Sequence, residues 1–159
     1  MLSIAPKSAR SCVMRLQDLT YTFGLPAQPE APRRARRHAQ RALAIWQAAD
    51  EDVEVATLLV SELVTNAVTH GSRQSEGDES AEIVLTLRKA GARLWITVRD
   101  GESAPPFRRS GLPDIAEAGR GITIVSTLAE RWGYDFTSDG GKDVWCVLPL
   151  NQKQKAGLS

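Results

Sequence analysis

Two neighbouring apolar stretches constrain the fold of this chain most strongly. Residues 82–90, EIVLTLRKA, and residues 93–100, RLWITVRD, are rich in β-branched and other apolar side chains, which is typical of strands. A short connection that contains Gly91 joins them, and so short a connection predicts an antiparallel hairpin. We therefore expect a sheet built around antiparallel pairs.

The remaining elements are predicted from apolar spacing and from turn residues. The expected strands are 16–24, 134–138 and 143–150, the expected helices are 33–49, 53–70 and 120–133, and loops are expected at 72–80 and 101–119. The acidic run at 50–52 supplies a candidate N-cap for the second helix. This order predicts a two-layer α/β sandwich, in which about three helices cover one face of a mostly antiparallel mixed sheet.

Length and composition indicate one globular domain. The chain has 159 residues, of which 42% are hydrophobic and 25% charged, which is enough for a full core. We expect a flexible N-terminus over 1–12, a single domain over 13–150 and a flexible tail over 151–159. No apolar run approaches the length of a membrane span, and the N-terminus lacks a signal-peptide core, so we expect a cytoplasmic protein without membrane contact.

Positive charge gathers in the N-terminal part of the chain. Residues 1–50 hold eight Lys or Arg against three Asp or Glu, whereas residues 51–159 hold twelve against sixteen. The excess lies in RRARRHAQR, residues 33–41, on one face of the first expected helix. Such a run is usually a solvated face, and the helix offers a single aromatic residue, Trp46, so nucleic-acid binding is weakly supported.

The stretch SELVTNAVTHG, residues 61–71, places two polar residues in an apolar helix. Glu62 and Asn66 lie about 40° apart on a helix, in an arc otherwise made of Val and Leu side chains. A buried carboxylate is unfavourable without partners, and an Arg partner would account for a lone Glu. A Glu and an Asn one turn apart fit a site better, because an amide oxygen can bind Mg²⁺ and a desolvated carboxylate can accept a proton.

Two further patterns are weak when taken singly. Asp100 ends an apolar strand, where its carboxylate can accept a hydrogen bond from an exocyclic amine such as that of adenine, although an Asp that begins a turn is common. Gly119 and Gly121 lie at the start of the helix expected over 120–133, where backbone N–H groups can bind phosphate, although a plain loop-to-helix junction looks the same. The glycines form neither a P-loop nor a dinucleotide fingerprint.

The order and spacing of these features resemble those of a known family. A Glu-x-x-x-Asn helix, a strand-end Asp, a loop and a Gly-x-Gly at a helix start together resemble the GHKL (Bergerat-fold) ATP-binding proteins, which include gyrase and the histidine-kinase catalytic domains. Within that group, SELVTNAVTHG, GRGITIVSTLAERWG and GGKDVWCVLPL are most similar to the anti-sigma-factor serine/threonine kinases of the actinobacterial type. The resemblance covers about residues 16–150.

The resemblance implies a role for each matching residue. Glu62 would be the general base or orienting carboxylate, Asn66 the Mg²⁺ ligand, and Asp100 the acceptor for the adenine amino group. The other residues implied to bind the nucleotide are His70, Gly71, Gly101, Gly119, Arg120, Gly121 and Ile122. ATP and Mg²⁺ are the implied cofactors, a mobile lid is implied at about 102–118, and Arg108 or Arg109 are further candidates to reach the phosphates.

The implied function is phosphorylation of a separate antagonist protein on Ser or Thr, combined with binding of a sigma factor. A homodimer is implied as one arrangement. Two departures support an alternative, a non-catalytic ATP-responsive module that gates a protein partner: the glycine box Asp-x-Gly-x-Gly reads DGESA, with Glu102 and Ala104 in glycine places, and Thr123 stands where a further Gly is common.

Overall fold

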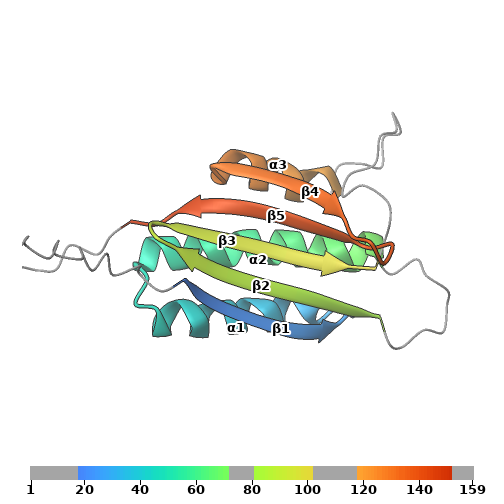
Figure 1. Ribbon diagram of the computed structural model, residues 1–159, viewed down its shortest axis with the longest axis horizontal. Helices are drawn as coiled ribbons and strands as arrows, with labels where there is room; N and C mark the ends of the chain where they lie inside the picture. Colours follow the sequence, from blue (N-terminus) through green and yellow to red (C-terminus); the bar gives the residue numbers. More distant parts are fainter. Residues whose placement is uncertain (1–17, 72–80, 102–117, 152–159) are drawn as a thin grey trace, which may run out of the picture.

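The computed structural model describes residues 18–71, 81–101 and 118–151 (Figure 1). In chain order the elements are β1 (Leu19–Pro26), α1 (Ala31–Ile45), α2 (Asp50–Gly71), β2 (Glu82–Ala90), β3 (Arg93–Asp100), α3 (Ala118–Leu128), β4 (Arg131–Phe136) and β5 (Lys142–Pro149). The expected N-terminal segment, the expected 72–80 loop and most of the 101–119 loop lie outside the described residues.

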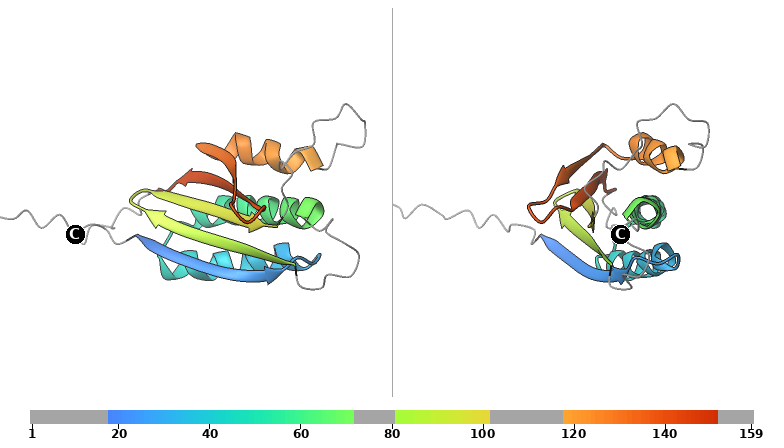
Figure 2. Two further views of the ribbon diagram at one scale, coloured as in Figure 1. Left: turned by 45° about the vertical axis from the view of Figure 1, so that its right-hand side comes forward. Right: turned by 90° about the vertical axis from the view of Figure 1, so that its right-hand side faces the viewer.

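The described strands form one five-stranded sheet in the order β1-β2-β3-β5-β4. The expected hairpin is confirmed, because β2 and β3 pair antiparallel with Thr86 opposite Thr97. The other three pairings of the described strands are antiparallel as well. An end-on view shows the three helices together on one face of the sheet (Figure 2), which confirms the two-layer α/β sandwich.

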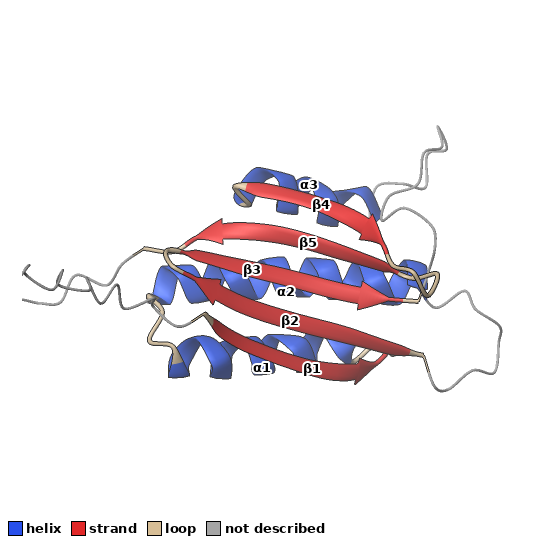
Figure 3. Ribbon diagram, in the orientation of Figure 1, coloured by secondary structure: helices blue, strands red, loops and turns tan. Residues whose placement is uncertain are grey.

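Figure 3 shows the sheet in front of the helices, and the core residues come from both of these layers. Apolar side chains alternate along the three central strands, and those that point toward the helices are buried: Ile83, Leu85, Leu87, Leu94, Ile96, Val98, Val144, Cys146 and Leu148. They pack in one cluster with Leu59 and Leu63 of α2. The alternation therefore fixes which face of each strand receives the helices.

Small residues let α1 lie close to α2. Its buried residues are Ala31, Ala35, Ala39, Ala42 and Leu43, at helical spacing. The helix begins two residues earlier than predicted and ends at Ile45 rather than Ala49. Gln47 then adopts a left-handed conformation with φ of 55°, which α-helical residues do not have. The chain turns at this point into α2.

The structure starts β4 earlier than the sequence predicted. α3 ends at Leu128, and residues 131–133, predicted to be helical, begin β4. Gly133 lies opposite Trp145 of β5, and a Cβ on Gly133 would come within 2.7 Å of the Trp145 ring. The glycine therefore lets an indole lie across the strand. Local helical spacing does not reveal this contact, because it joins two different strands.

The acidic residues 50–52 form the first turn of α2, rather than a cap before it. Negative charge is favourable at a helix N-terminus. Asp52 is buried, and its carboxylate accepts hydrogen bonds from the backbone N–H and side-chain amide of Asn151, at 2.8 and 2.9 Å. Asn151, which we expected to begin the flexible tail, is thus held against α2, and the rest of the expected tail lies outside the described residues.

Candidate active site

Three element ends meet at one end of the sandwich. The C-terminal half of α2, the end of β3 and the start of α3 lie together at the right of Figure 1. α2 packs against both α3 and β3. The sequence-predicted site residues that the structure describes are carried by these three ends and the adjoining residues.

Glu62 and Asn66 lie at the edge of the core. Asn66 is 7% exposed, and Glu62 is half-buried. Leu58, which shares their predicted arc, is 39% exposed. The arc is therefore not uniformly buried, because the centre of the α2 core face lies nearer Leu59 and Leu63. The two polar residues sit where the buried side of α2 meets its surface.

A glycine on α3 makes room for the carboxylate of Glu62. A Cβ on Gly121 would lie 2.9 Å from Glu62 Oε2, closer than real Cβ atoms come. Gly119 and Gly121 belong to the beginning of α3, which starts at Ala118, two residues before the predicted start at residue 120. The structure thus brings the candidate base and a glycine of the Gly-x-Gly pattern together.

The beginning of α3 suits an anion. Backbone N–H groups in the first turn of a helix have no intrahelical acceptor and lie at the positive end of the helix dipole. A phosphate placed there would lie near the Glu62 carboxylate, and two negative groups repel each other. A bound phosphate at this position therefore needs a cation beside it.

Asp100 is part of a buried ion pair that the sequence analysis missed. Lys142 Nζ donates to Asp100 Oδ1 at 2.9 Å, and the side chains of Lys142 and Asp100 are 0% and 2% exposed. The two residues lie directly opposite each other in the β3–β5 pairing. One signal could have revealed Lys142: it is in phase with Val144, Cys146 and Leu148, which are apolar and buried on the helix face of β5.

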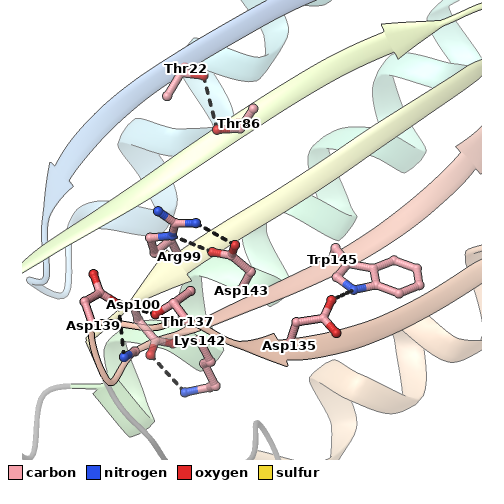
Figure 4. A network of polar contacts seen from close by, with 11 residues as sticks. Thr22, Thr86, Arg99, Asp100, Asp135, Thr137, Asp139, Lys142, Asp143 and Trp145 are labelled. Atoms are coloured by element: carbon pink, nitrogen blue, oxygen red, sulfur yellow. Dashed lines mark hydrogen bonds and ion pairs between the residues drawn. The ribbon is translucent and has the colours of Figure 1, made fainter.

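The turn before β5 presses against the end of β3. A Cβ on Gly141 would overlap the backbone carbonyl of Asp100, so a glycine is required for this approach. The turn is closed by a hydrogen bond from the Thr137 N–H to the Gly141 carbonyl at 2.8 Å, and Thr137 also bonds the Asp139 carboxylate. Figure 4 shows this turn beside the Asp100–Lys142 pair. The start of β5, and with it Lys142, is therefore fixed against β3.

For several of the other predicted site residues, the structure describes only the backbone or does not describe the residue. Gly101 is exposed and follows β3 directly, and Ile122 is half-buried on α3. His70 and Gly71 end α2, and Gly119 and Arg120 lie in α3, but their side chains are outside the described part of the structure. Arg108, Arg109, Glu102 and Ala104 lie outside the described residues altogether.

A family model for the histidine kinase-like ATPase domain matches residues 25–148. The chain belongs to that family. Its match takes in α2, β3, α3 and most of β5, the elements that carry the candidate site. The ATPase-domain family and the two-layer fold agree with the GHKL resemblance drawn from the sequence.

Individual relatives of this ATPase domain are consistent with the family. The chain is 35% identical over 88 residues to the anti-sigma F factor of Bacillus licheniformis, a match that covers 55% of this chain and 53% of that protein. The chain thus spans about half the length of this curated relative.

Two solved structures share the fold. The RsbU and RsbW domains of a Mycobacterium tuberculosis protein align with a TM-score of 0.62 at 22% identity, over 83% of this chain and 32% of that chain. The SiaB–SiaC complex of Pseudomonas aeruginosa aligns with a TM-score of 0.63 at 10% identity, over 84% of this chain and 91% of that chain. These likenesses show the fold.

The potential metal ligands among the described residues fit a site in which the protein supplies few of the ligands. Among the described residues, no group of three or more His, Cys, Asp or Glu side chains could hold a metal ion. The protein therefore offers no cage of side chains in this part of the chain. Asn66, a nearly buried amide, fits a Mg²⁺ ion that takes most of its ligands from nucleotide phosphates and water.

Proposed function

We propose that this ATPase domain is a Mg-ATP-dependent serine/threonine protein kinase of the anti-sigma-factor type, which phosphorylates an antagonist protein in trans. The observation that carries the proposal is the position of the Glu62 carboxylate against Gly121 at the beginning of α3. A candidate proton acceptor and a candidate seat for phosphate are thereby within one small region. The similarity to an anti-sigma F factor supports the choice of partner class.

The proposed transfer requires few chemical groups from the protein. The hydroxyl oxygen of a Ser or Thr on the antagonist forms a bond to the γ-phosphorus of ATP, and the bond from that phosphorus to the β–γ bridging oxygen breaks to release ADP. Glu62 accepts the hydroxyl proton. Positioning and charge neutralisation supply most of the catalysis in phosphoryl transfer, so the beginning of α3 would hold the phosphates in line with the attacking hydroxyl.

Asn66 would hold Mg²⁺ one helical turn from Glu62. When bound with ATP, this ion neutralises phosphate charge that would otherwise repel the Glu62 carboxylate. Asp100 would accept a hydrogen bond from the adenine amino group at the other end of the site. The nucleotide would thus span the distance from the end of β3 to the beginning of α3.

The exposed face of α1 is the proposed surface for an acidic protein partner. Its arginines are Arg33, Arg34, Arg36, Arg37 and Arg41, which are all exposed. None of them takes part in the ion pairs among the described residues. Burial and then the charges of Arg41 and Arg34 lower the pKa of His38 on the same helix, so the positive charge of this face at neutral pH comes from arginine. A sigma factor or an antagonist with an acidic surface would be complementary.

The location of the proposed kinase follows from its proposed partners. Within the described ranges, no helix is long and apolar enough to cross a membrane. Partners that regulate transcription would place the protein in the cytoplasm, and a homodimer remains part of the proposal through the GHKL resemblance alone.

Incubation with γ-labelled ATP, Mg²⁺ and candidate antagonist proteins from the same genome tests the proposal. We expect label on a Ser or Thr of one antagonist, and loss of both ATP binding and label in Asn66→Ala. Thr65→Ala is the matched control, because Thr65 is exposed on the adjacent position of α2. Mg-ATP affinity that is unchanged in Asn66→Ala would remove the metal assignment.

A specific observation favours the alternative of a non-catalytic binding module. The Asp100 side chain is only 2% exposed, so a nucleobase reaches it only after neighbouring groups move. Nucleotide binding would then be coupled to rearrangement of the site, as a gating module requires. ATP-dependent capture of an antagonist or sigma factor without label on Ser or Thr would support the module and exclude the kinase.

A further inference from the structure

Lys142 stands out among the cations of the described residues because its side chain is fully buried. The ion pairs of Arg88, Arg93 and Arg99 lie on half-exposed side chains, where such pairs contribute little. A buried pair is different, because apolar residues of the same volume often stabilise a fold as well or better. Stability alone therefore does not account for a lysine at this position.

The neighbouring residue pair in the sheet provides a useful contrast. Arg99 and Asp143 are the preceding partners in the β3–β5 pairing, and the Arg99 guanidinium binds both carboxylate oxygens, at 2.7 Å each. Lys142 instead approaches Asp100 with a single ammonium, 2.9 Å from Oδ1. The alternation of the strands puts the Arg99 pair on the open face of the sheet and the Lys142 pair on the helix face, which carries the candidate site (Figure 4).

The position of Lys142 is held from two sides. Its backbone lies opposite Asp100 in β3 and opposite Phe136 in β4. The preceding residue, Gly141, packs against the Asp100 backbone. An ammonium anchored in this way can fix the orientation of the carboxylate that it contacts.

We propose that Lys142 is a positioning residue for nucleobase recognition: its buried ion pair orients Asp100 as the acceptor for the exocyclic amine of adenine. The inference rests on the proposed function, because it assigns Lys142 a role at the end of the same nucleotide site that would bind the nucleobase. Lys142 acts through Asp100 and does not itself contact the phosphates. Its removal should therefore weaken recognition of the base and leave recognition of the triphosphate intact.

Binding of three probes to folded protein separates these two parts of the nucleotide: Mg-ATP, Mg-GTP and inorganic tripolyphosphate with Mg²⁺. In Lys142→Met, we expect ATP affinity to fall about 10- to 100-fold, the effect of losing a hydrogen bond to a charged group, with tripolyphosphate affinity unchanged. The preference for ATP over GTP should shrink by the same factor. Lys142→Gln keeps a donor without the charge, so its loss should be smaller.

Lys89→Met is the matched control, because Lys89 lies on β2 opposite Leu94 and away from the strand end that carries Asp100. It should leave all three affinities unchanged. Equal losses for ATP and tripolyphosphate in Lys142→Met would assign Lys142 a structural role and overturn the proposal. An unchanged ATP to GTP ratio in that variant would overturn it as well.

A measurement on the unaltered chain covers the case in which the variants do not fold. In protein labelled with ¹⁵N-lysine, ATP should shift the Lys142 ammonium resonance and tripolyphosphate should not. If the Lys142 resonance does not shift at saturating ATP, the inference is contradicted, but the proposed function still stands. If the unaltered protein binds tripolyphosphate but neither ATP nor GTP, the proposed function itself fails.

Discussion

The two ends of the candidate site hold their carboxylates in different ways. Glu62 is half-buried and lies against Gly121, and no ion pair among the described residues involves it. Asp100 is buried and paired with Lys142. In the proposed reaction Glu62 would accept the hydroxyl proton, whereas Asp100, held by Lys142, would accept only a hydrogen bond from the nucleobase. The difference supports two separate proposed roles: proton transfer by Glu62 on α2 and recognition of the nucleobase by Asp100 on β3.

The largest expected effect is on the rate of phosphoryl transfer, when Glu62 on α2 is replaced. Glu62→Gln should lower the rate of phosphoryl transfer by about 10²- to 10⁴-fold, the usual contribution of a general base, with little change in ATP affinity. Single-turnover transfer and equilibrium binding measure the two effects separately. Glu54→Gln, at an exposed position of the same helix, is the control. A normal transfer rate in Glu62→Gln would refute the base role.

At the end of β3, we expect a loss of stability in addition to the loss of ATP affinity. Lys142→Met removes one partner of a buried ion pair, which lowers the free energy of unfolding by about 3–5 kcal/mol. Urea denaturation measures this change. The double variant Asp100→Leu/Lys142→Met removes both charges and should recover most of the loss. Arg88→Met, which breaks a half-exposed pair, should have no measurable effect. If Lys142→Met were as stable as the unaltered chain, the pair would not be buried as described.

Gly121→Ala should move stability and activity in opposite directions. Alanine favours a helix over glycine by about 1 kcal/mol, so α3 should gain intrinsic stability. The added Cβ would lie 2.9 Å from Glu62 Oε2, so the Glu62 carboxylate would have to move. Because a misplaced catalytic group reacts more slowly, we expect phosphoryl transfer to be roughly tenfold slower. A double-mutant cycle tests the link. In a Glu62→Ala background, Gly121→Ala should have no further effect on the rate; an additive loss would show that the glycine acts on something else.

The smallest expected effect is on the reactivity of the Cys146 thiol, which lies in the core on β5. Burial raises the pKa of the Cys146 thiol to about 12, so in a Cys12→Ser background iodoacetamide should alkylate native protein slowly at pH 9 and unfolded protein rapidly. Because the unfolded thiol ionises at lower pH than the folded thiol, stability should decline as the pH rises from 9 toward 12. Cys146 lies on β5 four residues after Lys142. Fast alkylation of folded Lys142→Met would show that the damage spreads beyond the strand end.

The sequence predicted local features of the site better than contacts between elements. The β2–β3 hairpin was predicted with its bounds, since the two apolar stretches and the Gly91 turn between them are both local signals. Glu62 and Asn66 were predicted as neighbours from helical geometry alone. The contact between Gly121 and Glu62 joins two helices, and the Lys142–Asp100 pair joins two strands, so both depend on packing that local spacing does not encode.

The contact between Asp52 and Asn151 has a practical consequence for experiments on this chain. The beginning of β1 and the end of β5 lie at the left of Figure 1, opposite the end of β3, and Asn151 is fastened there to the first turn of α2. Along α2, Asp52 and Asn66 are separated by about 20 Å. A fluorophore or fused reporter attached after Asn151 would therefore emerge remote from the nucleotide end, where it could report binding without obstructing it.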